Sequence, residues 1–187
     1  MGVVIGVIVA IIVIALIGFL VWRTMQNRRI EDTRKRFGPE YDRAVEQHGG
    51  NEREAAGELS ERKAQVEQVT VRQLTPEQRQ QYSDDWRSIQ AEFVDNPGDA
   101  VIRADGMITN AMKNIGYPVD DFSSIENVAS VRFPEAADNY RQAHAITEQQ
   151  QRDGASTEDL RQAMVLYRSL FERLVGMPQG SQAEAAQ

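Results

Sequence analysis

Hydrophobic side chains are distributed very unevenly along this chain of 187 residues. Residues 2–22 contain no charged residue and consist almost wholly of Val, Ile, Leu, Ala, Gly and Phe. As a helix this stretch would be ~32 Å long, which matches the ~30 Å hydrocarbon core of a bilayer. Its many β-branched residues disfavour a helix in water, but lipid offers the backbone no other hydrogen-bond partner. The pattern predicts a transmembrane anchor at residues 1–22.

A cleaved signal peptide is the main alternative for this segment. Such a peptide has Lys or Arg before an apolar run of about 7–15 residues and a small-x-small cleavage site after it. Here no basic residue precedes the run, the run is longer, and it ends without an A-x-A sequence. We therefore expect the helix to be retained. Gly2, Gly6 and Ala10 recur every four residues, a pattern that lets membrane helices approach closely and predicts a homodimer through this helix.

Charge changes sign after the anchor. Residues 23–37 form a basic juxtamembrane segment, in which two acidic residues accompany six basic ones: Arg23, Arg28, Arg29, Arg34, Lys35 and Arg36. These six predict contact with a bilayer surface and its anionic headgroups. Because basic flanking residues stay on the cytoplasmic side, they also predict a single-pass plasma-membrane protein whose C-terminal part is cytoplasmic.

The rest of the chain is acidic, with 15 basic and 26 acidic residues after position 36. This balance argues against sequence-independent binding of nucleic acid, which needs a basic patch. Cysteine is absent, which excludes disulfides, thiolate metal sites and Cys nucleophiles.

Residues 38–73 are predicted to form a charged helical stalk. Gly38-Pro39 ends one helix and starts another, Gly49-Gly50 stops the second, and Asn51 with Glu54 predicts the cap of a third helix that extends to about residue 68. Apolar residues in this third helix have coiled-coil spacing only if Arg62 occupies a seam position, so we expect a mainly solvated helix.

Apolar residues recur at helical spacing between residues 74 and 175, with short connections, and predict an all-α domain of four or five helices packed as a bundle. Thr75-Pro76 and Ser156-Thr157 supply helix N-caps, and Asp120 or Asp121 caps a short helix between them. No segment shows the period-two alternation of a strand. Residues 176–187 are small and polar and predict a disordered tail.

Candidate catalytic groups are sparse. The paired carboxylates mostly lie at helix starts, where they cap backbone N–H groups. Neither His48 nor His144 belongs to a cluster of metal ligands such as a Glu-x-x-His pattern. Nucleotide-binding glycine motifs and a G-x-S-x-G elbow are absent. We therefore expect no enzymatic activity, no cofactor and no metal.

One loop combines aromatic and acidic residues in a way that suits recognition of a partner. Its candidate partner-binding residues are Tyr117, Asp120, Asp121 and Phe122, in the sequence Gly-Tyr-Pro-Val-Asp-Asp-Phe. Packing of both rings into the bundle is the alternative.

Three stretches resemble a family of uncharacterised bacterial single-pass membrane proteins that are often labelled hypothetical or secreted. They are residues 36–43 (RFGPEYDR), 116–122 (GYPVDDF) and 156–168 (STEDLRQAMVLYR). The resemblance spans most of the chain up to Val175. It implies a bacterial membrane location, and it brings no catalytic residue, ligand or partner.

Two functions are compatible with these patterns. The first is a membrane-tethered helical interaction or adaptor protein that binds a cytoplasmic or membrane protein. The second is a membrane-anchored bundle with a small-ligand or catalytic pocket between its helices, lined by Trp86, Tyr140, His144 and Tyr167. The second function requires these four residues to converge on a cavity.

Overall fold

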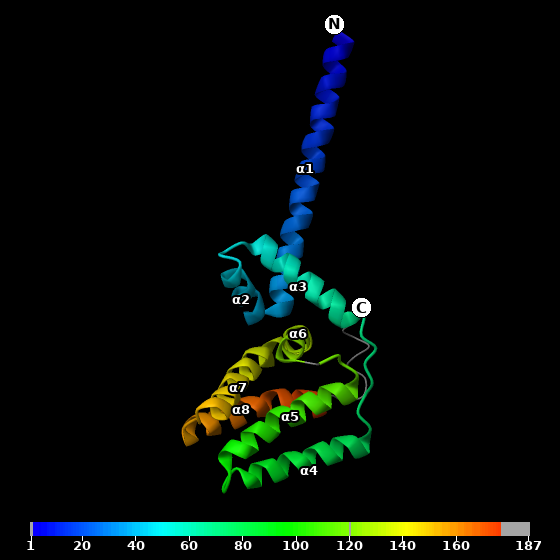
Figure 1. The fold of residues 1–187 in the computed structure, drawn as a ribbon. Coiled ribbons are helices and arrows are strands. Elements are labelled where there is room, and N and C mark those ends of the chain that lie inside the picture. The colour runs from blue at the N-terminus through cyan, green and yellow to red at the C-terminus, as the bar shows by residue number, and fades with distance from the viewer. Residues whose placement is uncertain (1, 120, 177–187) are drawn as a thin grey trace. The chain divides into compact units, whose positions relative to one another are not determined.

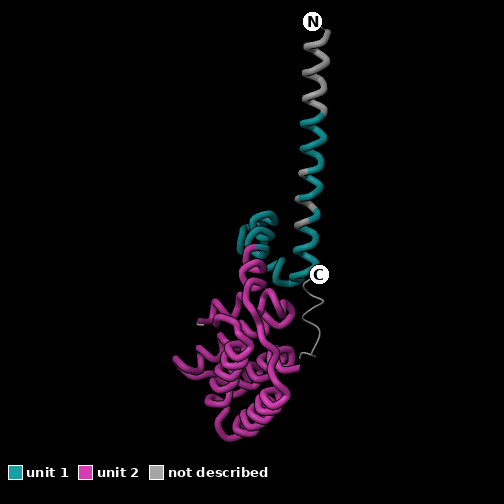
Figure 2. The backbone as a smooth tube through the Cα atoms, turned by 90° about the vertical axis from the view of Figure 1, so that its right-hand side faces the viewer, with its two compact units in different colours: residues 1–60 teal, residues 61–187 magenta. Residues whose placement is uncertain are grey.

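The computed structural model describes residues 2–119 and 121–176, with side chains left out at residues 2–13, 22, 26, 27 and 29. Within these ranges helices are the only regular secondary structure, which confirms the all-α part of the predicted fold class (Figure 1). The helices are α1 (Gly2–Phe37), α2 (Pro39–Gln47), α3 (Glu52–Glu67), α4 (Pro76–Glu92), α5 (Pro97–Ile115), α6 (Phe122–Arg132), α7 (Pro134–Arg152) and α8 (Thr157–Val175). The chain divides into two compact units, residues 1–60 and 61–187 (Figure 2).

The first unit contains α1, α2 and most of α3. Gly38, with a φ of +51°, separates α1 from α2, and a left-handed backbone of this kind suits glycine because it has no Cβ. The α3 helix is capped as predicted, since the Asn51 carboxamide oxygen accepts hydrogen bonds from the backbone N–H groups of Arg53 and Glu54.

The α3 helix is packed along its thin apolar stripe, whereas a mainly solvated helix was expected. Ala55, Ala56, Leu59 and Val66 are buried. Arg62, in the second unit, does not lie in a coiled-coil seam but donates a hydrogen bond to the Ser130 hydroxyl of α6. Small side chains such as alanine give a weak hydrophobic pattern and still let a helix pack closely. The domain and stalk boundaries drawn from the sequence stay predictions.

No helix in the described part of the chain is both long enough and apolar enough to cross a membrane. The predicted span at residues 2–22 and the predicted dimer face of Gly2, Gly6 and Ala10 fall mostly on side chains outside the described residues. The predicted tail, apart from Gly176, also lies outside them. The described part of α1 exposes its large apolar side chains from Ile14 to Met25.

In its described residues the second unit contains a bundle of five helices, α4 to α8, where four or five were predicted. The α8 helix packs against α7, α5 and α4, while α6 packs against α7 and α4 against α5. The buried face of α8 is the one that the apolar spacing predicted: Leu160, Ala163, Met164, Tyr167, Leu170, Phe171 and Leu174.

Helix starts in the bundle follow the predicted capping residues. Thr75 and Gln78 form a reciprocal capping box at α4, and Ser156 accepts a hydrogen bond from the Asp159 backbone N–H at α8. At α6 the cap is Asp121, whose carboxylate accepts a hydrogen bond from the Ser124 backbone N–H at 2.8 Å. Short side chains that bond free backbone N–H groups thus fix where these helices begin.

The segment between α3 and α4 is tied to the end of α5. The backbone N–H of Arg72 donates to the carbonyl of Ile115 at 2.6 Å. Gly116 comes next with a φ of +108°, and a Cβ there would lie 3.1 Å from the carbonyl oxygen of Thr70. Glycine is therefore needed at this position for both its backbone conformation and the close approach of the neighbouring segment.

Candidate functional site

A polar cluster around Asp105 lies inside the bundle. One carboxylate oxygen of Asp105, Oδ1, accepts a hydrogen bond from the Tyr167 hydroxyl at 3.0 Å and lies 3.2 Å from Nδ1 of His144. The Tyr167 hydroxyl also lies 2.8 Å from Oγ1 of Thr147. The Tyr140 ring packs beside the rings of His144 and Tyr167. We call these five residues the Asp105 cluster. It joins α5, α7 and α8 through side-chain contacts.

Helix geometry explains why these side chains meet. Tyr140, His144 and Thr147 are separated by four and three residues along α7, so they lie on one face of that helix. Asp105 lies four residues after Val101 and three before Ile108, both fully buried on α5, so its carboxylate is placed at the edge of the buried face. This spacing relative to Val101 and Ile108 is the sequence signal for Asp105, which does not belong to any pair of adjacent carboxylates.

Phe122 covers the cluster from α6. Its ring stacks on the His144 imidazole with centroids 4.2 Å apart and planes 10° from parallel. Because Tyr140 and Tyr167 are fully buried, aromatic rings occupy the space among these helices. Trp86, the fourth residue of the predicted pocket, instead stacks on Phe171 of α8 with centroids 4.7 Å apart. The predicted pocket residues therefore lie in two packed groups.

Burial and the Asp105 carboxylate set the protonation of the cluster. Burial alone would lower the pKa of His144, but its hydrogen bond with Asp105 and the negative charges of Asp105 and Glu148 outweigh burial and raise that pKa. Burial and the Asp105 charge both raise the pKa values of Tyr140 and Tyr167. The phenols therefore stay neutral, and His144 favours its charged form against Asp105.

The two buried tyrosines give a matched test of this geometry. Tyr167→Phe is expected to lower the free energy of unfolding by about 2 kcal/mol, because it removes hydrogen bonds to a carboxylate and a hydroxyl. Tyr140→Phe is expected to be neutral or stabilising by about 1 kcal/mol, because the Tyr140 hydroxyl is buried without a hydrogen-bond partner among the described residues. Urea unfolding followed by Trp86 fluorescence, in a Trp22→Phe background that leaves one tryptophan, measures both. Equal losses in the two variants would contradict the assigned hydrogen bonds.

The predicted partner-binding loop is partly built into the bundle. Tyr117 is buried, and Phe122 is half-buried against His144. Asp121 is exposed and is used as the α6 cap, while Asp120 lies outside the described residues. Both rings thus pack as the alternative interpretation expected, and recognition of a partner by this loop stays a prediction.

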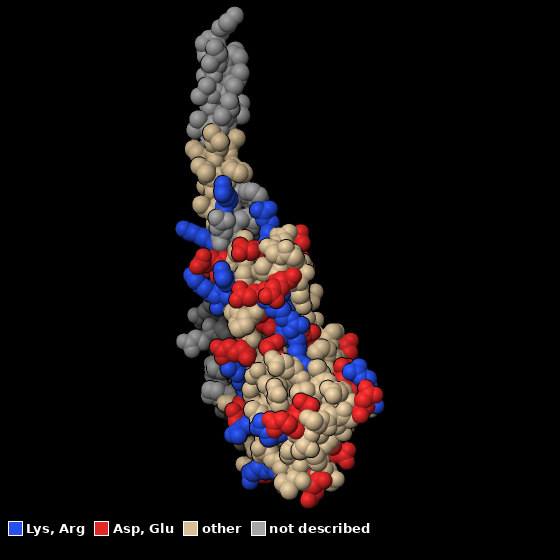
Figure 3. All heavy atoms as spheres, turned by 90° about the vertical axis from the view of Figure 1, so that its left-hand side faces the viewer, with Lys and Arg blue, Asp and Glu red and all other residues tan. Residues whose placement is uncertain are grey.

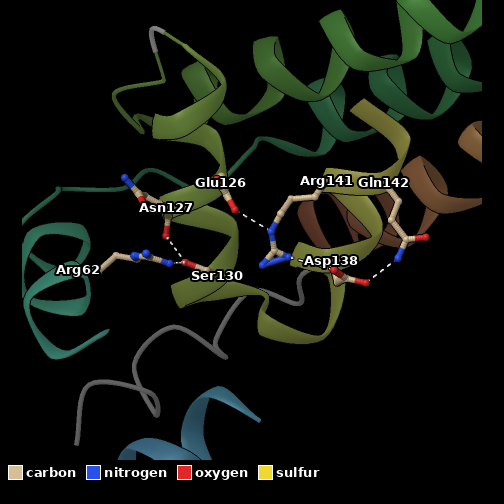
Figure 4. Close-up of polar contacts among 7 residues, drawn as sticks. All are labelled: Arg62, Glu126, Asn127, Ser130, Asp138, Arg141 and Gln142. Carbon is tan, nitrogen blue, oxygen red and sulfur yellow. Dashed lines mark hydrogen bonds and ion pairs between the residues drawn. The ribbon is translucent and has the colours of Figure 1, made fainter. Parts of the chain in front are cut away.

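Ion pairs occupy the face where α6 meets α7 (Figure 4). Nε of Arg141 donates to Oε1 of Glu126 at 2.6 Å, and Nη1 of Arg141 lies 3.3 Å from Oδ1 of Asp138. Only 8% of the Arg141 side chain is exposed. Elsewhere on α6, the fully buried Ser130 hydroxyl accepts from Arg62 and donates to the carbonyl of Asn127 (Figure 4).

The predicted membrane-contact residues lie along the second half of α1. Arg23, Arg28, Arg34, Lys35 and Arg36 are exposed, and the side chain of Arg29 lies outside the described residues. Two of them form ion pairs within the first unit, Lys35 with Glu31 at 3.3 Å and Arg34 with Asp42 at 3.8 Å. Figure 3 shows an uncharged surface on the described part of α1 that gives way to Lys and Arg.

No group of three His, Asp or Glu side chains in the described ranges is arranged to hold a metal ion. Comparison with family models, with curated proteins and with solved structures found no match to this chain.

Proposed function

We propose that this chain is a membrane-tethered helical interaction protein, in which α1 anchors the chain and the C-terminal bundle binds a partner protein. The observation that carries the proposal is the exposed apolar surface of α1. Between Ile14 and Met25 its large apolar side chains are 52–69% exposed, namely Ile14, Leu16, Ile17, Phe19, Leu20, Val21 and Met25. A contiguous apolar surface of this kind is costly in water and suits a lipid environment.

The neighbouring sequence supports a membrane as the occupant of this surface. The exposed segment continues residues 2–13, which carry no charge, and it precedes the exposed basic residues of α1. Basic residues after a span favour a cytoplasmic location for the chain beyond them, so the bundle faces the cytoplasm and its partner is a cytoplasmic or membrane protein. Basic side chains near the span also favour anionic headgroups.

The bundle itself supports binding over catalysis. Several of its buried or half-buried polar side chains pair with each other, such as Asp105 with Tyr167 and Arg141 with Glu126, and Phe122 covers the one histidine of the cluster. A catalytic or small-ligand pocket among Tyr140, His144, Tyr167 and Trp86 would need empty space between these side chains. The rings of the first three pack on one another, and Trp86 packs on Phe171 instead.

One variant, with a single cysteine, can test both membrane location and orientation. The chain has no cysteine, and Ser88 on α4 is exposed, so Ser88→Cys introduces a single accessible thiol. We expect the variant in the membrane fraction, with little labelling by a membrane-impermeant maleimide in intact cells and strong labelling after lysis. Ser181→Cys provides a second position. Strong labelling of intact cells would place the bundle outside, and recovery in the soluble fraction would reject the anchor.

Partner binding can be tested by crosslinked affinity capture of the full chain from detergent-solubilised membranes. A recurrent stoichiometric partner is expected with the full chain and not with a chain reduced to residues 1–60. Residues 1–60 carry the whole of α1, so proteins held only by the anchor are recovered with both baits. Recovery of the bait alone under several detergents and crosslinkers would count against an adaptor function.

A further inference from the structure

A polar groove runs between α4 and α5, and no residue of the Asp105 cluster lines it. It has a volume of about 830 Å³, and residues of these two helices line it. Gly106 opens its centre, because a Cβ at this position would meet no heavy atom within 4 Å. Tyr82, Ile89 and Met107 are buried and form its base.

Four side-chain amides line the groove: Gln78, Gln81, Asn110 and Asn114. Their free hydrogen-bonding groups differ, because some are used within the bundle. The side-chain oxygen of Gln78 accepts from the Thr75 backbone N–H, so the NH₂ group of Gln78 is left to donate to a ligand. Gln81 and Asn114 donate to Asp85 and Tyr82, respectively, which leaves their oxygens as acceptors.

The Tyr82 hydroxyl adds a donor to this set. It accepts from Nδ2 of Asn114 at 2.6 Å, so its own proton remains to be donated. Burial raises the pKa of Tyr82, which keeps that proton in place. The groove therefore offers both donors and acceptors, which are the two kinds of group that the N–H and C=O of a peptide backbone need.

Lys113 gives the groove a charge preference. It is exposed and forms no ion pair with a described residue, whereas Arg103 is paired with Glu92 and Asp85 accepts from Gln81. A carboxylate that reached Lys113 would form a charge-assisted hydrogen bond. Residues 78 to 89 of α4 span ~16 Å, which corresponds to about five residues of extended chain.

We propose that the groove between α4 and α5 binds an extended segment of a partner protein through its backbone, with an acidic side chain of that segment on Lys113. The inference rests on the proposed function, because it names the surface through which the bundle would hold its partner. Side-chain amides suit this ligand because each is chemically equivalent to a peptide group and can pair with one through both N–H and C=O.

The test uses the purified full chain in mild detergent and an array of acetylated, amidated hexapeptides with a central Asp, Asn or Lys and varied neighbours. A subset of Asp peptides is expected to bind about tenfold more strongly than the matched Lys peptides, since a charge-assisted bond is replaced by repulsion. Lys113→Ala is expected to make Asp and Asn peptides equivalent.

Gly106→Leu fills the groove and is expected to weaken peptide binding about tenfold or more. Gly57→Leu is the matched control, because Gly57 is also helical and exposed and a Cβ there also meets no atom within 4 Å. Unchanged Trp86 fluorescence in Gly106→Leu would show that the bundle stays folded. Absence of peptide binding to the unmodified chain, or equal binding by Gly106→Leu and Gly57→Leu, would overturn the proposal.

Failure of the groove and failure of the adaptor function give different results. If crosslinked capture recovers the same partner with Gly106→Leu as with the unmodified chain, the adaptor function stands and the groove is not its site. If peptides bind and Gly106→Leu abolishes that binding, while capture recovers no partner, the groove stands as a peptide site and the membrane-tethered adaptor function falls.

Discussion

Replacing Asp105 by alanine is expected to lower the free energy of unfolding of the bundle by about 3 kcal/mol. The carboxylate accepts from Tyr167 and faces His144, and hydrogen bonds to charged groups contribute about 1.5–3 kcal/mol each. Asp105→Asn keeps an acceptor oxygen and removes the charge, so its loss should be about half as large. Urea unfolding followed by Trp86 fluorescence in the Trp22→Phe background measures both losses. A loss below that of Tyr167→Phe would contradict a central role for Asp105.

The same substitution should remove a pH dependence. The pKa of His144 is raised in the folded state, so the folded protein binds this proton more tightly than the unfolded chain does. The stabilisation is fully present below the unfolded value of about 6.5 and is lost as the pH rises through the higher folded value. We expect stability to fall over that window in the unmodified chain and not in Asp105→Ala or His144→Gln. NMR titration of His144 gives the pKa directly, and a value at or below that of the unfolded chain would refute the ion pair.

Replacing Arg141 by alanine is expected to cost about 3 kcal/mol of stability, close to the value for breaking other buried ion pairs. Arg141 is 8% exposed and holds Glu126 of α6 against α7. The expected loss comes mainly from leaving a partly buried carboxylate without this guanidinium. Arg141→Lys keeps the charge but loses the planar fork, so an intermediate loss is expected.

Arg161 is the matched control for this prediction. It pairs with Glu158 through two hydrogen bonds of 2.8 and 2.5 Å, which is geometry as close as that of Arg141, but both side chains are more than half exposed. Water screens such a pair, so Arg161→Ala should leave unfolding unchanged within error. Comparable losses in the two variants would show that burial does not decide the strength of these pairs.

Local signals explain which parts of the fold were predictable. Thr75, Asp121 and Ser156 cap helices because their short side chains bond backbone N–H groups a few residues away, and this requires no knowledge of the rest of the structure. The buried apolar face of α8 could also be predicted, because its apolar residues recur at helical spacing over the whole helix.

Features that depend on distant residues were not predictable in the same way. Two of the four buried residues of α3 are alanine, so its hydrophobic pattern is thin and gives little sign of how closely the helix packs. Tyr140, His144 and Tyr167 do come together, but the sequence carried no sign that Trp86 would join Phe171 instead. Asp105 was missed because its partners are 39 and 62 residues away in the chain.

The hydrogen bond between Arg72 and Ile115 gives the second unit a defined point of mechanical attachment. A pull on the chain from its N-terminal side would meet the Arg62 hydrogen bond to Ser130 and then residue 72 before it reached α4. The load then passes to the carboxyl end of α5, where Gly116 lets the two backbones lie close together. Because α5 packs against α4, α7 and α8, that load is shared by most of the bundle, and α4 is shielded from being peeled away alone.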